Sequence, residues 1–292
     1  DDNDGFGSRS LRLGAGVALG EERRTVVSAG AEYRHVERER PGFTGEPTVE
    51  GWGGDVGAAH RFGNVRLGVR AGALRFTGAA TVPTWLLGAD GRLAGGSWRA
   101  AVAGGPAYET LRAGTTLGAG VDGGDDDVLE GVSASGTVNV PLSARLELWS
   151  RGEWLGLDDD NARANLQAAL RYGLAPSLSA LYSGGVLTFS DATATYWSPR
   201  YYTLHSLGLE WRRRWPRGLL IGAQGLAGVS WYDETLPGGP DASGSAFQWS
   251  LAGELGWQTT RWDLGVTGAY GTDRGASGYE AFLGTLRARY RW

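Results

Sequence analysis

The clearest regularity along the chain is an alternation of apolar and polar residues with a period of two, which is typical of amphipathic β-strands. Within 280–292, every second residue from Phe282 to Trp292 is apolar or small, while the positions between them include Arg287 and Arg289. The same alternation recurs in the segments 247–258, 262–270, 219–231, 164–172, 65–71 and 11–19. The pattern therefore predicts an all-β chain.

Two architectures produce this alternation, a soluble β-sandwich and a membrane β-barrel. The apolar faces tend to carry Trp, Tyr or Phe at their ends, as expected of the aromatic girdles of a membrane barrel. The opposite faces carry Arg, Glu, Asp, Gln and Gly, which is too polar for a packed core and suits a wet lumen. We therefore expect a transmembrane antiparallel β-barrel in the bacterial outer membrane, with residues 1–292 forming a single domain.

The connections between the predicted strands alternate in length, as periplasmic turns and extracellular loops do. Short turns are expected near 20–23, 62–64, 92–97, 141–143, 173–176, 215–216 and 258–261, and longer polar loops near 37–50, 108–127, 157–161, 191–199, 233–244 and 272–278. The spacing gives about 15 strands, and single-chain barrels have even numbers. We therefore expect a barrel of about 16 strands whose first strand precedes residue 1.

The composition excludes several other classes. Glycine contributes 50 of 292 residues without a period of three, which excludes a collagen-like chain, and 11% aromatic residues exclude a disordered one. The chain has no cysteine, so it contains neither a disulfide framework nor a thiolate zinc site. The net charge of -4 gives no indication of nucleic-acid binding. The absence of methionine is interpreted as the mark of a processed chain or a fragment.

Residues with catalytic or metal-binding chemistry are scattered. His35, His60 and His205 fall on three different predicted strands, and none has HExxH, GxSxG or P-loop spacing around it. His60 is interpreted as a girdle residue. The acidic runs 125–127 and 158–160 lack the spacing of a calcium loop, and we interpret them as solvated loops. We expect no enzymatic activity, no catalytic residue, no cofactor and no metal site.

The predicted inner wall is more informative, because its polar positions combine both charge signs, amides and a tryptophan. We predict these residues to line the lumen: Arg145, Glu147, Trp149, Arg151, Glu153, Arg163, Gln167, Arg171, Glu254, Asp263, Arg287 and Arg289. Such groups exchange hydrogen bonds with sugar hydroxyls, and an indole face stacks on a pyranose ring, which suits a hydroxylated neutral polymer. An ordinary porin lumen, in which the mixed charges pair and keep the pore hydrated, fits the pattern equally well.

One segment resembles a known family. The run Tyr196-Trp197-Ser198-Pro199, followed by Tyr202, resembles the C-terminal barrel of bacterial cellulose-export outer-membrane proteins. Related barrels export poly-N-acetylglucosamine and other exopolysaccharides. The resemblance implies about 16 strands that follow a periplasmic superhelix of tetratricopeptide repeats, and no 34-residue repeat lies within this chain. It also implies that the five motif residues order a loop at the outer end of the pore.

These observations together predict a passive outer-membrane channel for secretion of an exopolysaccharide, either cellulose-like or a related polymer. The alternatives are a small-solute porin and, with less support, an outer-membrane enzyme or adhesin. The expected partners are membrane lipid and lipopolysaccharide, the polysaccharide chain, the barrel-assembly machinery and an inner-membrane polymer synthase reached through a periplasmic repeat region, without nucleic acid. The aromatic C-terminus, with Tyr290 and Trp292, resembles the signal read by the assembly machinery, so loss of Trp292 is expected to impair insertion.

Overall fold

The structure is a computed structural model that describes residues 6–20, 22, 24–38, 48–76, 81–93, 95–106, 129–191, 198–235, 241–273 and 279–290. The described residues form strands and one short 3-10 helix, η2 (Pro216–Gly218). The strands are β1 (Phe6–Leu19), β2 (Thr25–Arg38), β3 (Thr48–Phe62), β4 (Val65–Phe76), β5 (Thr81–Leu93), β6 (Gly96–Pro106), β7 (Glu130–Pro141), β8 (Leu146–Leu157), β9 (Ala162–Ala175), β10 (Leu178–Phe189), β11 (Tyr201–Arg214), β12 (Leu219–Thr235), β13 (Asp241–Gln258), β14 (Trp262–Asp273) and β15 (Tyr279–Tyr290).

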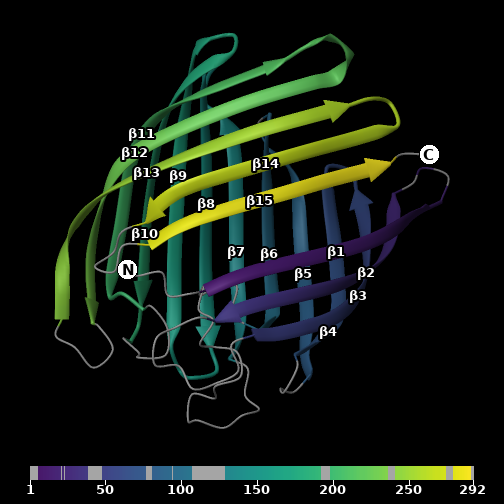
Figure 1. Cartoon of the computed structure of the whole chain (residues 1–292). Coiled ribbons are helices and arrows are strands. Elements are labelled where there is room, and N and C mark those ends of the chain that lie inside the picture. Colours follow the sequence, from purple (N-terminus) through teal and green to yellow (C-terminus); the bar gives the residue numbers. More distant parts are fainter. Residues whose placement is uncertain are drawn as a thin grey trace.

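All the strands belong to one 15-stranded sheet in which each strand pairs with the next along the chain. Every pairing is antiparallel. Figure 1 shows the sheet curling round, so that β11–β15 and β1–β4 cross in front of β5–β10. The predicted all-β antiparallel barrel is therefore confirmed.

One face of the sheet exposes a continuous apolar surface. Leu13, Leu207 and Leu286 are 65%, 67% and 80% exposed, respectively, and many other Leu, Val and aromatic side chains of this face are exposed as well. The pairing register places such residues on the same face, as where Leu207 of β11 lies opposite Ala227 of β12. A soluble protein buries side chains of this kind, whereas a membrane barrel presents them to lipid. We call this the outer face.

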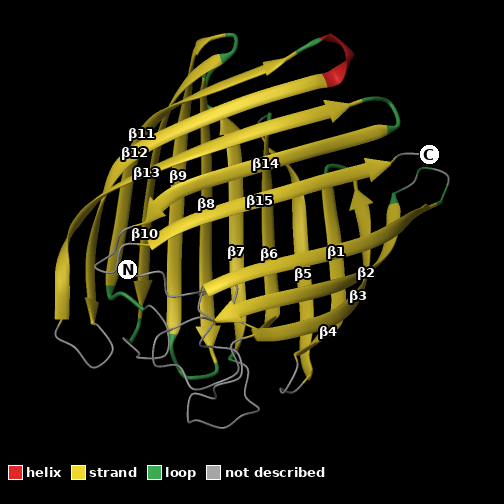
Figure 2. Cartoon of the chain, in the orientation of Figure 1, coloured by secondary structure: helices red, strands yellow, loops and turns green. Residues whose placement is uncertain are grey.

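The connections fall at two ends of the barrel. Those after odd-numbered strands define the turn end, and those after even-numbered strands define the loop end. Figure 2 shows the described connections in green, with η2 in red after β11. At the turn end Gly218 has φ of +85°, and a Cβ there would overlap the carbonyl oxygen of Gln258, so the β11–β12 turn requires glycine.

Tryptophans of the outer face form two groups near these ends. Trp211, Trp257 and Trp262 lie on the outer face close to the turn end, where β11 and β13 finish and β14 begins. Trp154 and Trp231 lie on the same face toward the loop end. The middle of this face is mostly aliphatic or small, so the arrangement matches the aromatic girdles of a membrane-spanning barrel.

The prediction of a long loop over 157–161 is wrong. Strand β8 continues to Leu157 and β9 begins at Ala162, which leaves a four-residue turn. The backbone N–H of Asn161 donates to Asp159 Oδ1 at 3.1 Å, so an acidic side chain closes the turn locally. The turn before β8 also holds Arg145, which was predicted to be one of the lumen residues of the inner wall. Among the described residues no helix is both long and apolar enough to cross a membrane.

The inner face of the sheet is not polar along its whole length, which corrects the sequence prediction. Near the loop end Leu129, Leu155, Leu157 and Phe189 pack into a buried apolar cluster. Leu155 and Leu157 continue the inward positions of β8 beyond Glu153. The sequence prediction followed the charged positions of this strand and did not extend to these two leucines. The polar part of the inner wall therefore lies toward the turn end and the middle of the barrel.

Candidate functional site

The polar inner wall begins with β8 and β9, whose predicted lumen residues face one another in register. Glu147 lies opposite Arg171, and Arg151 lies opposite Gln167. Trp149 lies on the same face between them, opposite Ala169. It is the one tryptophan that the described strands place on the inner face. The two strands therefore supply a wall of carboxylates, guanidinium groups, an amide and an indole.

Glu153 is the centre of a compact charged cluster on this wall. Its carboxylate pairs with Arg151 Nη2 at 2.7 Å and with Arg163 Nη2. The side chains of Glu153 and Arg163 are only 9% and 7% exposed, respectively. Burying these charges is tolerable because each carboxylate oxygen meets a guanidinium group. The cluster joins β8 to β9 where the polar wall meets the apolar cluster.

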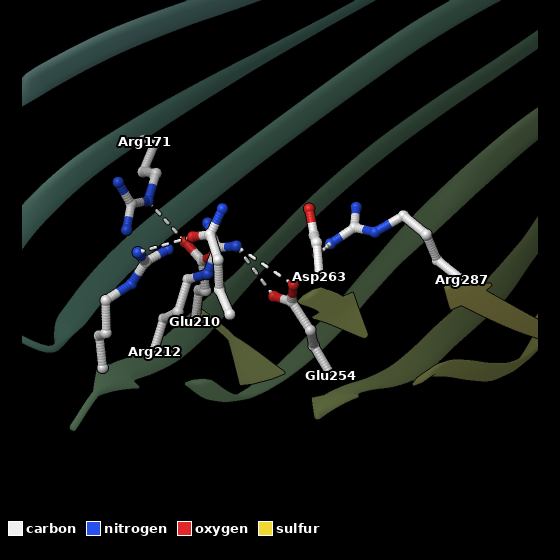
Figure 3. A network of polar contacts seen from close by, with 8 residues as sticks. Arg171, Glu210, Arg212, Glu254, Asp263 and Arg287 are labelled. Carbon is white, nitrogen blue, oxygen red and sulfur yellow. Dashed lines mark hydrogen bonds and ion pairs between the residues drawn. The ribbon is translucent and has the colours of Figure 1, made fainter. Parts of the chain in front are cut away.

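A second set of ion pairs crosses the wall from β8 to β15. Arg171 Nε lies 2.5 Å from Glu210 Oε2 and its Nη1 lies 3.7 Å from Glu147 Oε2. Figure 3 shows the pairs that continue around the wall. Arg212 Nη2 lies 3.0 Å from Glu254 Oε2, and Arg287 Nη2 lies 3.0 Å from Asp263 Oδ1. Most of these pairs join neighbouring or next-neighbouring strands, so they brace the sheet across its width.

The N-terminal strands carry further wall residues that the sequence prediction did not include. Asp55 of β3 pairs with Arg12 of β1 and with Arg70 of β4, the latter at 3.2 Å. Arg66 pairs with Asp90 at 2.8 Å, and other missed wall residues are Glu32, Arg34, Glu210 and Arg212. All of them occupy polar positions in strands whose polar and apolar residues alternate. The period-two pattern was therefore a sufficient signal to find them.

The remaining predicted lumen residues are placed less completely. Arg289 of β15 lies opposite Asp263 in the backbone register, and its side chain lies outside the described residues. Tyr290 lies opposite Trp262, whereas Trp292 lies outside the described residues. Arg145 is exposed, and its backbone N–H donates to Ser143 Oγ at 3.3 Å. The structure brings Arg145 to the rim of the turn end.

The motif behind the family resemblance lies at the loop end. Tyr196 and Trp197 fall outside the described residues. Ser198 and Pro199 are buried, and the Pro199 carbonyl accepts from the Phe189 backbone N–H at 3.1 Å. Tyr202 is also buried, and its hydroxyl accepts from Gln248 Nε2 at 2.6 Å. The described part of the motif is therefore packed against β10 and β13.

Two cavities open on the inner wall. The larger, of about 890 Å3, lies at the turn end, and its lining includes Arg92, Asn139, Arg145, Glu147 and Arg171. The smaller, of about 310 Å3, lies among the strands from β1 to β8, and its lining includes Arg12, Asp55 and Arg70. Both are bordered mainly by polar groups, and both belong to the wall described above.

The histidines lie away from this wall. His60 is on the outer face, where its Nδ1 lies 2.7 Å from Thr25 Oγ1 and its ring centroid lies 4.4 Å from that of Phe62. His205 is also on the outer face, with Nδ1 2.7 Å from the Tyr182 hydroxyl. Within the described residues no group of three or more His, Cys, Asp or Glu side chains is arranged to hold a metal ion. The polar chemistry of the barrel is thus concentrated on its inner wall.

No family model matches this chain, and no curated protein matches it. Among solved structures, a bacterial polysaccharide outer membrane secretin is similar with a TM-score of 0.72 at 13% identity, covering 98% of this chain and 91% of that one. The alcaligin receptor FauA of Bordetella pertussis has 15% identity and a TM-score of 0.44, covering 98% of this chain and 57% of that one. The siderophore receptor PirA of Acinetobacter baumannii has 11% identity and a TM-score of 0.48, covering 100% of this chain and 56% of that one.

The likeness to the secretin shows the fold of an outer-membrane β-barrel. The apolar, exposed outer face agrees with this fold. The protein is accordingly a β-barrel of the bacterial outer membrane, with an apolar outer face and a polar inner wall.

Proposed function

We propose that this barrel is a channel through which an exopolysaccharide, cellulose-like or a related polymer, crosses the outer membrane. The observation that carries the proposal is the inner wall, where guanidinium groups and carboxylates alternate around Trp149. Sugar hydroxyls exchange hydrogen bonds with both kinds of group, and the indole offers a stacking surface for a pyranose ring. The similar fold of a polysaccharide secretin supports the same function.

The proposed channel acts without a chemical step. A polymer that must move needs many weak contacts, because a tightly held chain would stall in the pore. On this wall each ion pair already satisfies much of its own hydrogen-bonding capacity, as in Arg212–Glu254 and Arg287–Asp263. A passing hydroxyl therefore competes with existing partners and binds weakly. The polymer is made and pushed from the inner membrane.

The proposed partners follow from this path. Lipid and lipopolysaccharide surround the outer face, and the barrel-assembly machinery inserts the chain. An inner-membrane polymer synthase, reached through a periplasmic helical-repeat region, supplies the polysaccharide. Co-purification of a synthase subunit with the full-length protein from membranes would support this arrangement, whereas export without any such association would contradict it.

Replacement of Trp149 tests whether the wall recognises sugar. We expect Trp149→Leu to reduce export by about two- to tenfold, the effect of losing roughly 1 kcal/mol of aromatic stacking. The matched control is Trp154→Leu, on the outer face of the same strand and 50% exposed. Export is measured as secreted polymer per folded barrel. Equal export from the two variants would contradict recognition by Trp149.

The alternative of a small-solute porin is favoured by one observation. The wall carboxylates Asp55, Asp90, Glu147, Glu153, Glu210, Glu254 and Asp263 are all paired with arginine, as in a pore whose charges only keep it hydrated. Conductance in planar bilayers separates the two functions. A steady open pore that added oligosaccharide does not block would indicate the porin.

A further inference from the structure

Arginines of the inner wall are concentrated near the turn end. Arg92 lies close to the β5–β6 turn, Arg145 lies in the β7–β8 turn, and Arg214 ends β11. The strand register also places Arg99 of β6 on the inner face, where it lies opposite Thr137 of β7. The described arginines on the inner face or lining the cavity near this end are Arg61, Arg66, Arg92, Arg99, Arg145, Arg171, Arg212, Arg214 and Arg287, and Arg24, Arg217 and Arg261 lie in the other turns.

The carboxylates of the same region already form ion pairs with some of these arginines. Asp90 pairs with Arg66, and Glu147 and Glu210 share Arg171. Glu254 and Asp263 pair with Arg212 and Arg287, respectively. Every wall carboxylate described near the turn end is thus matched by a guanidinium group.

A surplus of positive charge remains. Arg61, Arg92, Arg99 and Arg145 are exposed, and none of them has a carboxylate within ion-pair distance among the described residues. Arg214 donates to the neutral amide oxygen of Gln258 at 3.2 Å. Guanidinium groups stay charged throughout the physiological pH range. The wall at the turn end therefore carries a net positive charge, although the whole chain carries -4.

The larger cavity lies within this positive region. Arg92, Arg145 and Arg171 line it, together with Asn139 and Ser179, and Glu147 is the one carboxylate among its lining residues. Its volume of about 890 Å3 lies within the range of about 300–1,000 Å3 found for ligand sites. Arg92 approaches it from the end of β5, and Arg145 approaches it from the β7–β8 turn. Their guanidinium groups are therefore available to a ligand in this cavity.

The loop end has the opposite character. Asp158, Asp159 and Asp160 form the β8–β9 turn, and Asp191 and Asp233 lie at the same end. The basic residues described near this end include Arg163, which pairs with Glu153, and Arg200. The charge thus changes sign from the turn end to the loop end.

We propose that the transported polymer is an anionic polysaccharide, whose acidic groups first bind Arg92, Arg99 and Arg145 at the turn end. The inference rests on the proposed export function and narrows its substrate, given above as cellulose-like or a related polymer, to a polymer that carries acidic substituents. Carboxylate, sulfate and phosphate substituents share the relevant chemistry, because a guanidinium group binds each of them through paired N–H donors.

The change in charge from the turn end to the loop end predicts a direction of polymer movement. Positive charge at the turn end raises the local concentration of an anionic chain and aligns it with the pore. Acidic residues at the loop end repel the same groups and favour their release. The attraction is electrostatic and long-ranged, so it weakens as added salt shortens the screening length to about 8 Å at physiological ionic strength.

The test uses the purified barrel in planar bilayers. We compare the wild type with Arg92→Gln/Arg99→Gln/Arg145→Gln and with Arg213→Gln. Arg213 is a matched control because it lies at the same end on the outer face, with its guanidinium carbon 5.3 Å from the Trp215 ring centroid. The blocking probes are an oligogalacturonate, a sulfated cello-oligosaccharide and a neutral cello-oligosaccharide of equal length, added at the turn end.

We expect a wild-type pore that prefers chloride to potassium and is blocked by both anionic oligomers at concentrations at least tenfold lower than by the neutral one. The triple variant loses most of this difference, and Arg213→Gln keeps it. Block by oligogalacturonate alone would restrict the substrate to carboxylates. Equal block by neutral and anionic oligomers would overturn the anionic assignment while leaving polysaccharide export standing. A conducting pore that no oligomer blocks would overturn both.

Discussion

Glu153 is a residue with a large electrostatic consequence, because it is buried and pairs with two arginines, of which Arg163 is buried as well. We expect Glu153→Gln to cost about 3–5 kcal/mol of unfolding free energy, since it leaves the buried Arg163 next to a neutral amide. The measurement is the urea midpoint of the folded barrel in lipid. Glu147→Gln is the control, since Glu147 and Arg171 are 39% and 43% exposed and such pairs contribute about 1 kcal/mol or less. Equal losses in both variants would contradict the role of burial.

At the same scale, the sequence predicts the face of the sheet on which a residue lies, but it predicts much less well which residue its side chain pairs with. Alternation assigns Arg171 and Glu254 to the polar face, because a strand turns successive side chains to opposite sides. The Arg171–Glu210 pair joins residues 39 positions apart. That pairing depends on strand register and on side-chain reach across two strands, and neither quantity is visible in a local pattern.

Among the elements, β8 combines both characters of the inner wall, with charged residues toward the turn end and leucines toward the loop end. We expect Leu155→Ala to destabilise the barrel by about 2–5 kcal/mol, because Leu155 is 3% exposed and packs with Leu129 and Phe189. Leu166→Ala on the outer face of β9 removes a side chain that is 57% exposed and serves as the control. Heat-dependent mobility on gels reports both. A smaller loss for Leu155 than for Leu166 would exclude the cluster as a packed core.

The strands themselves are predictable because period-two alternation is a local property of each segment. The lengths of the connections between the strands are less predictable. The run Asp158–Asp160 has the composition of a solvated loop, yet it forms a tight turn in which Asp160 has φ of +65°. Asp160 tolerates this conformation, and Asp159 closes the turn by accepting from the Asn161 backbone N–H. The same polar composition therefore suits a short turn and a long loop equally.

For the molecule as a whole, the outer face follows from the alternation of residues and the antiparallel meander follows from the alternating connections, whereas the apolar cluster inside the barrel follows from neither. When the alternation assigns one face of the sheet to lipid, the other face is predicted to be polar or apolar from its most frequent residues. Leu155 and Leu157 are inward positions on a mostly charged face. Their packing depends on β10, from which Phe189 approaches across β9, and such contacts between strands are set by the register of the sheet.

The separation of arginines at one rim from aspartates at the other also makes the pore electrically asymmetric. Anions gather at the turn end and cations at the loop end, so the ion population within the pore depends on the sign of the applied voltage. We expect single barrels to rectify, passing more current at one polarity than at the other in dilute salt. The asymmetry fades in 1 M salt, where the screening length falls to about 3 Å. A linear current–voltage curve in dilute salt would contradict it; a curved one reveals which way each barrel has inserted.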